Sequence, residues 1–306
     1  MRKKISSEKI TWIDIMTPTE NDLSFLKENF DFHPFILKSI LPPIHHPRFE
    51  NYKDYLFLVL HYPFFDEKTK ETKSREIDII VTKNTLITIR YNNIAPLQSF
   101  FTKLTLYEKE RKEFTDEGVG EVLYRLLYEL LRNSFPKLDH ISEKIDSIEK
   151  EIFKEQKQKE VIEEISALKY DLINFKRIIQ PQLPVFEKLK EESKNFFGEH
   201  FEPYFNELVN CFLTIKEVLE THHRTLNELE ETNANLLSIK TNEIMKILTI
   251  FWVVISPLTL LATIYGMNTS YLPFTDIKYY DFWIIIGIMA VLSIIILVFL
   301  KKKKWI

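Results

Sequence analysis

The residues with the clearest chemical pattern lie near the C-terminal end, in a segment that is otherwise apolar. Four hydroxyl side chains share one helical face because their spacings are seven, three and four: Thr249, Ser256, Thr259 and Thr263. In a lipid bilayer such a stripe must face protein or water. The spacing leaves two interpretations open, a packing face between helices or the lining of a water-filled path. Trp252 lies on the same stripe, so either the helix is rotated or the ring fills a narrow place.

The apolar segment ends on a side-chain amide. Pro257 removes one backbone donor and leaves the carbonyl of Val253 without its helical partner, which bends the helix or presents that carbonyl to water. Gly266 is expected to end the helix in the left-handed conformation. The C-terminal end of the helix then brings the negative end of the helix dipole close to the amide oxygen of Asn268. Several such helices around an axis would form a ring of neutral oxygen acceptors, which attracts cations without holding them tightly.

Two uncharged runs of nineteen residues, 247–265 and 282–300, are each long enough to cross a bilayer core of about 30 Å. Lysines 301–304 follow the second run, and Lys240 and Lys246 precede the first, whereas the connecting loop carries Lys278 against Asp276 and Asp281. The positive-inside bias predicts a hairpin with both chain ends in the cytoplasm. The N-terminus lacks an apolar signal core, so we expect the residues up to about 243 to stay in the cytosol.

Composition argues against several classes of protein. The 306 residues contain one cysteine, Cys211, which excludes an internal disulfide and a cysteine-rich zinc site. The net charge of −3 gives no indication of nucleic-acid binding. The five glycines form neither a phosphate-binding loop nor a dinucleotide fingerprint, and no HExxH sequence occurs. We therefore expect neither an enzyme nor an organic cofactor.

Hydrophobic periodicity divides the rest of the chain into an α/β part and a helical part. Residues 9–15 and 55–62 read as strands, 19–30 as a helix capped by Thr19, and 76–90 as a hairpin about Lys83-Asn84. After Gly118, apolar residues at spacings of three and four predict a helical hairpin of coiled-coil type from 122 to 175, broken at Pro181 and Pro184. A single helix is then predicted from about Tyr204 into the first apolar run, with a seam that turns polar at Asn233 and Lys240.

At Tyr265-Gly-Met-Asn268 the sequence resembles the CorA family of magnesium channels, and the resemblance covers the whole chain. It implies an α+β cytosolic domain (1–117), a helical hairpin and stalk helix (118–243), and a transmembrane hairpin (244–306). In that hairpin the first span covers about 244–266, the outer loop 269–281 and the second span about 282–300. The resemblance further implies a homopentamer in the inner (plasma) membrane that imports Mg²⁺, with Co²⁺ and Ni²⁺ as further ions.

The same resemblance assigns roles to individual residues. It makes Gly266, Met267 and Asn268 the selectivity filter, with the Asn268 amides holding a hydrated ion. The residues that it places along the pore are Asn242, Met245, Leu248, Ser256, Thr259 and Thr263. Met245 and Leu248 form an apolar constriction near the cytosolic end, which gates by dewetting. The lysines after the second span ring the pore's cytosolic side.

Two departures from the family pattern affect regulation and ion selectivity. In relatives, carboxylates that bridge neighbouring subunits sense magnesium, and one half often follows a His-Pro like His33-Pro34, where this chain has Lys38 and Ser39. Glu207 is a candidate for the other half. The outer loop places aromatic Phe274 after Pro273, where relatives commonly carry an acid. The alternatives are a zinc transporter of the sister group and, in another class, a membrane-anchored signalling or scaffold protein.

Overall fold

The computed structural model describes residues 2–41, 43, 46–69, 71–154, 158–268 and 280–305. The chain divides into two compact units, Met1–Glu230 and Glu231–Ile306, called here the first and second units. The strands of the first unit are β1 (Arg2–Ser6), β2 (Thr11–Met16), β3 (Arg48–Asn51), β4 (Tyr55–Asp66), β5 (Glu71–Thr82) and β6 (Thr85–Arg90). They form one sheet in the order β1-β2-β6-β5-β4-β3. The β2–β6 pair is parallel and the other pairs are antiparallel.

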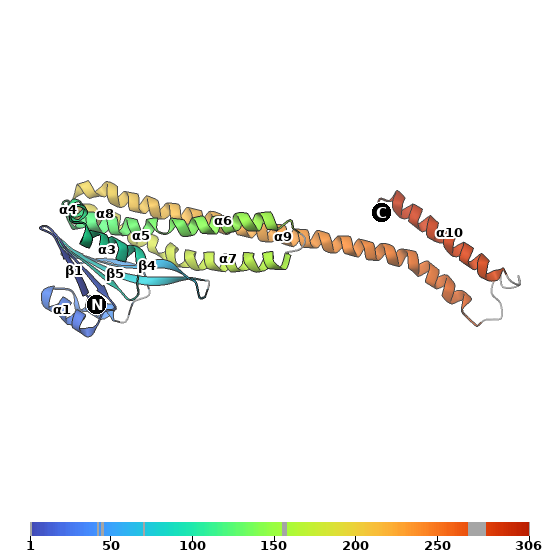
Figure 1. Ribbon diagram of the computed structural model, residues 1–306, viewed down its shortest axis with the longest axis horizontal. Helices are drawn as coiled ribbons and strands as arrows, with labels where there is room; N and C mark the ends of the chain where they lie inside the picture. Colours follow the sequence, from blue (N-terminus) through green and yellow to red (C-terminus); the bar gives the residue numbers. More distant parts are fainter. Residues whose placement is uncertain are drawn as a thin grey trace. The chain divides into compact units, whose positions relative to one another are not determined.

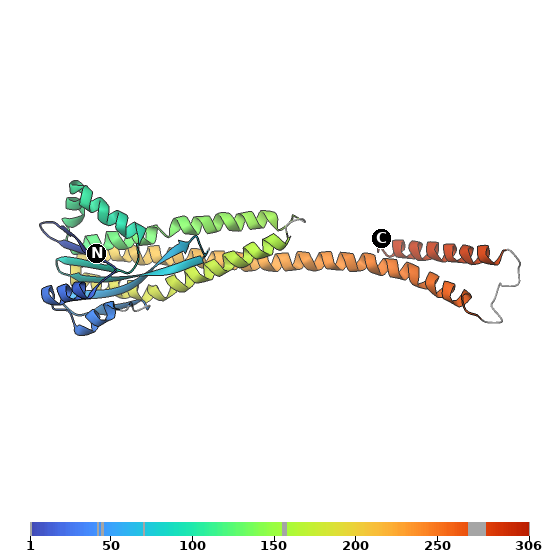
Figure 2. The ribbon, with the colours of Figure 1, turned by 60° about the horizontal axis from the view of Figure 1, so that its bottom comes forward.

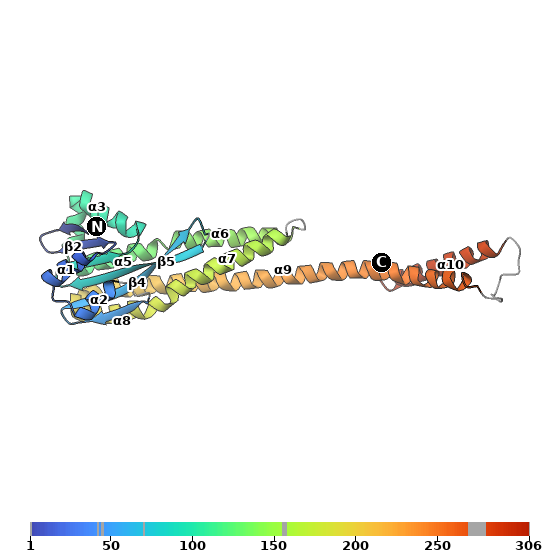
Figure 3. The same cartoon turned by 90° about the horizontal axis from the view of Figure 1, so that it is seen from below.

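Helices cover both faces of this sheet. They are α1 (Glu20–Asn29), α2 (Pro34–Ile40), α3 (Ala95–Leu106), α4 (Glu108–Thr115), α5 (Val119–Arg132), α6 (Phe135–Glu151), α7 (Gln158–Ile179) and α8 (Leu183–Phe197). Short 3₁₀ turns at Gln180–Gln182 and Glu199–Phe201 join the last helices. Figures 1 and 3 show α1 and α2 on one side of the strands and α5 and α7 on the other.

The alternation of side chains along the strands explains this layering. Ile13, Ile15, Ile80 and Ile87 point to the face covered by α1 and α2, where they form a buried apolar core with Leu26, Ile36 and Ile40. The opposite face carries a buried polar network. There Asp14 and Arg90 are each 1 % exposed and form an ion pair of 2.8 Å, and Thr88 donates a hydrogen bond to Asp14 Oδ1 (2.9 Å).

The predicted strands and the first helix are confirmed. β2, β4 and the β5–β6 hairpin fall on the runs that sequence periodicity selected, and β4 extends four residues beyond the predicted end, to Asp66. Thr19 precedes α1, and its backbone N–H donates to Asp22 Oδ2 (3.1 Å), which closes the first turn. β1 and β3 were not predicted.

The helical hairpin differs in one respect from the prediction. The apolar run from 122 to 152 is two helices, because α5 ends at Arg132 and α6 begins at Phe135. Pro136 lies in the first turn of α6, where its missing N–H costs nothing, and Asn133 Nδ2 donates back to the carbonyl of Glu129 (2.8 Å). Part of the predicted turn between α6 and α7, residues 155–157, lies outside the described residues.

The long helix is confirmed. α9 runs from Glu202 to Tyr265 and includes Pro257 within it, and it can be followed as one continuous ribbon in Figure 2. The second unit contains the C-terminal part of α9 and α10 (Asp281–Lys302). These two helices are long and apolar enough to cross a membrane.

Candidate functional site

The apolar parts of α9 and α10 are not core helices of this chain. The most apolar windows of the two helices are 0 % and 6 % buried, so their apolar side chains are exposed. An apolar surface of this extent needs a covering of lipid or of further copies of the chain. The stripe predicted from sequence lies within it.

The N-terminal part of the stripe surrounds an open hollow of about 450 Å³ on α9. Its lining consists of Met245, Leu248, Thr249, Trp252, Val253, Ser256 and Pro257. Three predicted pore residues, Met245, Leu248 and Ser256, therefore lie together, and Trp252 lies among them, as its place on the stripe indicated. Asn242 precedes the hollow by about one turn, and Thr259 and Thr263 follow it along the helix. All three are exposed.

The threonine hydroxyls on this stripe donate to their own helix. Thr249 Oγ1 donates to the carbonyl of Met245 (2.7 Å), Thr259 Oγ1 to that of Ile255 (3.1 Å), and Thr263 Oγ1 to that of Thr259 (2.9 Å). A hydroxyl has one proton and two lone pairs, so each of these oxygens can still accept a hydrogen bond. The face therefore offers oxygen acceptors, which suit a hydrated cation.

The end of α9 corrects one expectation. Gly266 was expected in the left-handed conformation, but the described glycines with positive φ are Gly118 and Gly198. Instead, Gly266 N donates to the carbonyl of Ala262 (2.9 Å) and Met267 N to that of Ile264 (3.2 Å). Gly266 thus keeps the four-residue spacing of the α-helix, and Met267 tightens the end to a three-residue spacing, which satisfies the carbonyls of Ala262 and Ile264 without a left-handed residue.

Asn268 follows this tightened turn directly, and its side chain is exposed in the single chain. Met267, beside it, is 56 % exposed. Residues 269–279 of the predicted outer loop, including Phe274 and Asp276, lie outside the described residues.

Glu207 on α9 already accepts a hydrogen bond from within the first unit. The phenol of Tyr124 on α5 donates to Glu207 Oε2 (2.7 Å). Burial and this contact raise the pKa of Tyr124 above its ordinary value, so the phenol keeps its proton and remains a donor. One lone-pair direction of Glu207 is therefore occupied. No pattern in the sequence indicated Tyr124 as its partner.

The position after His33-Pro34 carries positive charge from two elements. Ser39 Oγ donates to the carbonyl of Phe35 (2.6 Å) and accepts a hydrogen bond from Arg48 Nη2 (3.0 Å), while Lys38 is exposed on the same helix. Arg48 comes from β3, a strand that the sequence did not reveal, so its presence here was missed. Lys38 and Arg48 thus flank the place where relatives were expected to carry acids, and Arg48 is itself paired with Glu50 Oε1 (3.3 Å).

No cluster of three His, Cys, Asp or Glu side chains suited to a metal ion occurs in the part of the chain that the structure describes. The candidate site of a single chain is therefore a face of α9 with one amide at its end. Such a face can contact a hydrated ion only weakly unless other copies surround it.

Comparison with known proteins relates this arrangement to a family. A family model described as "CorA-like Mg2+ transporter protein" matches residues 7–302. The "Cobalt/magnesium transport protein CorA" of Thermotoga maritima is 30 % identical over 298 residues, covering 96 % of this chain and 83 % of the relative.

Solved structures agree in fold. The complete structure of the CorA magnesium transporter from Methanocaldococcus jannaschii has a TM-score of 0.83 and 25 % identity, covering 99 % of this chain and 94 % of that one. The cytoplasmic domain of ZntB from Vibrio parahaemolyticus has a TM-score of 0.64 at 18 % identity over 76 % of this chain and 89 % of that one, which shows a shared fold alone. Because the family match spans nearly the whole sequence and the full-length fold agrees, this chain belongs to the CorA-like Mg²⁺ transporter proteins.

Proposed function

We propose that this protein is a channel that imports Mg²⁺ across the plasma membrane as a homopentamer, with Co²⁺ and Ni²⁺ as further permeant ions. The observation that carries the proposal is the end of α9, where an exposed apolar helix with an acceptor stripe finishes at Gly266-Met267-Asn268. The proposal is also supported by the family model, which matches residues 7–302. The CorA magnesium transporter from Methanocaldococcus jannaschii shares this full-length fold.

In this proposal Gly266, Met267 and Asn268 form the filter at the outer mouth. Mg²⁺ gives up its water shell reluctantly, so a ring of Asn268 amides that bonds to the ion's water fits its chemistry better than a dry charged cage. Asn242, Met245, Leu248, Ser256, Thr259 and Thr263 line the path behind it. The threonine oxygens accept hydrogen bonds from the ion's water as it passes.

Membrane potential supplies the driving force. At about 2.3 kcal/mol per charge for each 100 mV, a divalent ion gains about 4.6 kcal/mol on entering a compartment that is negative by that amount. We infer that α9 and α10 both span the membrane, with both chain ends in the cytoplasm. The lysines that follow α10 support this orientation. In this proposal the chain consists of a cytosolic α/β domain (1–117), a helical hairpin with a stalk helix (118–243) and a transmembrane hairpin (244–306).

The apolar constriction leads to a prediction on gating. Replacing Met245 and Leu248 by serine is expected to increase the resting uptake of Mg²⁺ several-fold, because a polar lining keeps water in a narrow passage that an apolar lining expels. Uptake into dye-loaded liposomes at a fixed potential measures this. The matched control replaces Ile244 and Ile247, exposed apolar residues one position before each, by serine. If both double variants raise uptake equally, Met245 and Leu248 have no special gating role.

The charges near Ser39 lead to a prediction on regulation. Internal Mg²⁺ is expected to inhibit the wild-type channel only weakly, for two reasons. Lys38 repels a cation where relatives place acids, and Tyr124 already donates a hydrogen bond to Glu207. Patch recordings with internal Mg²⁺ raised through the millimolar range test this. Replacing Lys38 by Glu and Ser39 by Asp is expected to increase sensitivity about tenfold by reversing the local charge. Complete closure of the wild type at low-millimolar Mg²⁺, released by Glu207→Ala, would contradict the proposal.

The proposal as a whole is tested with purified protein in liposomes under an inside-negative potential. Uptake of Mg²⁺, Ni²⁺ and Zn²⁺ is measured separately, and the mass of the detergent-solubilised complex is determined in parallel. Mg²⁺ uptake with a mass of five chains supports the proposal. Zn²⁺ uptake without Mg²⁺ uptake would move the protein to the sister group, and no uptake of any ion would favour a scaffold.

A further inference from the structure

A carboxyl group is buried in the sheet of the first unit, far along the sequence from α9. Asp78 on β5 is 0 % exposed and lies on the face that α1 and α2 cover. Its Oδ2 atom is 2.6 Å from the phenol oxygen of Tyr91, which follows β6. The same phenol oxygen is 2.7 Å from the carbonyl oxygen of Ile40, the last residue of α2.

These two short contacts require a proton on Asp78. A tyrosine hydroxyl has a single proton, so it can donate to the carbonyl of Ile40 or to Asp78, but not to both. A backbone carbonyl only accepts, so Tyr91 must donate to Ile40. The contact of 2.6 Å with Asp78 is then a hydrogen bond only if the carboxyl group donates its own proton to the tyrosine oxygen. Both bonds coexist when Asp78 is a neutral carboxylic acid.

The electrostatic surroundings favour that neutral form. Burial is the largest cause that raises the pKa of Asp78, and with the smaller raising effect of the nearby Glu76 and the opposing effects of the Tyr91 hydrogen bond and of Arg48 on β3, the pKa reaches about 8. Burial, followed by the proximity of Asp78, raises the pKa of Tyr91, so this phenol keeps its proton over the whole physiological range. In the structure Asp78 Oδ1 is buried without a hydrogen-bond partner, which an ionised carboxylate would tolerate poorly.

The remaining charged groups on this side of the sheet lie around an adjacent hollow. His61 Nε2 on β4 is 3.5 Å from Glu76 Oε2, and both line a hollow of about 470 Å³ with Tyr91, His46 and Arg177 of α7. Through this hollow, water and protons can reach Glu76, which lies near Asp78. On α2, the carbonyl of Ile40 contacts Tyr91, and Lys38 is exposed.

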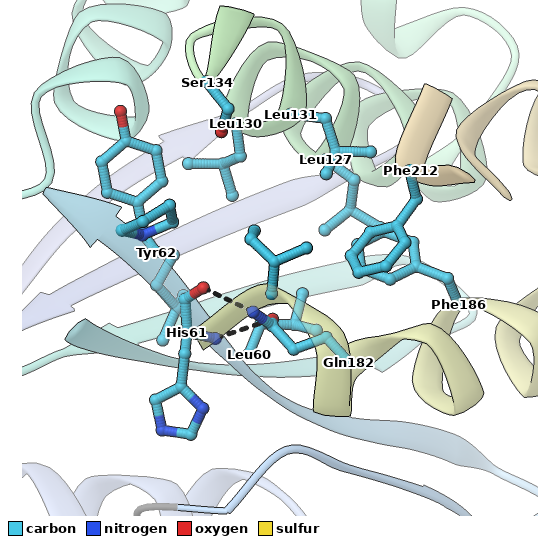
Figure 4. A pocket seen from close by; sticks show the side chains of 13 residues that line it. Leu60, His61, Tyr62, Leu127, Leu130, Leu131, Ser134, Gln182, Phe186 and Phe212 are labelled. Atoms are coloured by element: carbon cyan, nitrogen blue, oxygen red, sulfur yellow. Dashed lines mark hydrogen bonds between the residues drawn. The ribbon is translucent and has the colours of Figure 1, made fainter. Parts of the chain in front are cut away.

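The backbone of His61 is fixed at the edge of the sheet by Gln182, as Figure 4 shows. Beyond Val59, β4 has no pairing with β3, and the amide of Gln182 takes that place. Gln182 Oε1 accepts from His61 N (2.9 Å) and Gln182 Nε2 donates to His61 O (2.8 Å). The imidazole points away from the apolar pocket that Gln182 lines, toward Glu76.

We propose that the proton on Asp78 acts as a pH-sensitive latch, which ties β5 through Tyr91 to the end of α2 and opens as the pH at this domain rises. When Asp78 ionises, Tyr91 donates to the carboxylate instead. The carbonyl of Ile40 then loses its donor, and α2, which carries Lys38 and Ser39, is held less firmly.

The direction of the pH effect follows from the raised pKa. With α2 in place, Asp78 keeps its proton up to about pH 8, whereas with α2 released and the group exposed to water, Asp78 ionises near its ordinary value of 3.8. The released state therefore binds fewer protons between these values, and its population grows with pH. The hydrogen-bonded link from Asp78 through Tyr91 to Ile40 is therefore stable at acidic pH, weakens through neutral pH and is lost above about pH 8.

Hydrogen exchange of the full-length protein in detergent tests this. After correction for intrinsic rates, protection of the α2 amides is expected to fall by up to about tenfold per pH unit from pH 6 to 8 in the wild type. Asp78→Asn is expected to keep α2 protected with no such slope, because an amide donates to Tyr91 at every pH. Tyr91→Phe is expected to leave α2 poorly protected throughout.

Two further measurements complete the test. Asp66→Asn, an acid at the end of β4, is the matched control and is expected to retain the wild-type slope. The infrared band of a neutral carboxylic acid is expected near neutral pH in the wild type and not in Asp78→Asn. A wild type without a slope, an Asp78→Asn variant with the wild-type slope, or a wild type without that band would each overturn the proposal.

Discussion

Asn268→Ala is expected to abolish Mg²⁺ uptake by the purified protein. Each copy loses one amide that bonds to the ion's water at the end of α9. At about 1 kcal/mol for each lost hydrogen bond, five proposed copies together weaken ion capture by roughly three to four orders of magnitude. Uptake into dye-loaded liposomes under an inside-negative potential, measured at several external Mg²⁺ concentrations, checks the prediction.

The control for this variant is Asn195→Ala, which makes the same chemical change at an exposed position on α8. It is expected to leave uptake unchanged. Circular dichroism and the mass of the complex show whether either variant has lost its fold or its assembly. Normal uptake by a correctly assembled Asn268→Ala protein would remove Asn268 from the filter.

Asp14→Ala is expected to destabilise the first unit by about 3 to 5 kcal/mol, because it leaves the guanidinium of Arg90 buried without its ion-pair partner. Arg90 keeps Gln98 Oε1 (2.6 Å) and Asn93 Oδ1 (3.1 Å) as acceptors, but neither is charged. For a domain of this size the loss corresponds to a fall in Tm of roughly 6 to 20 °C. Thermal unfolding followed by circular dichroism measures it.

A double variant separates the cost of an unpaired charge from the contribution of the pair itself. Asp14→Leu combined with Arg90→Met is expected to recover most of the lost stability, because no charge is then left buried. Glu108→Ala breaks the exposed pair with Lys112 and is expected to change Tm little. Equal losses in Asp14→Ala and the double variant would show that the pair itself, not the orphaned arginine, carries the stability.

Sequence patterns predicted the elements that carry a long apolar or periodic run. β4 is apolar for most of its length, and α9 repeats its apolar residues with spacings of three and four, so both were recognised. β1 and β3 are short strands at the two edges of the sheet, and their side chains are mostly exposed or half-buried. Edge strands have little apolar alternation, which is why the sequence did not reveal them.

The details of the candidate site depended on contacts between distant segments. The stripe on α9 was predictable because all its residues belong to one helix with a fixed period. Arg48 reaches Ser39 only because β3 pairs with β4, and Tyr124 reaches Glu207 only because α5 packs near α9. Gly266 was misjudged because a tightened last turn and a left-handed glycine end a helix equally well, and the sequence does not distinguish them.

The internal hydrogen bonds of Thr249, Thr259 and Thr263 also bear on which sign of charge this face admits. A chloride ion or another anion needs hydrogen atoms directed at it when it leaves bulk water. These three hydroxyls have turned their hydrogens toward their own helix and present only lone pairs. In the proposed pore, this face would discriminate against anions without a fixed negative charge, so a cation that enters would not be held too strongly to leave.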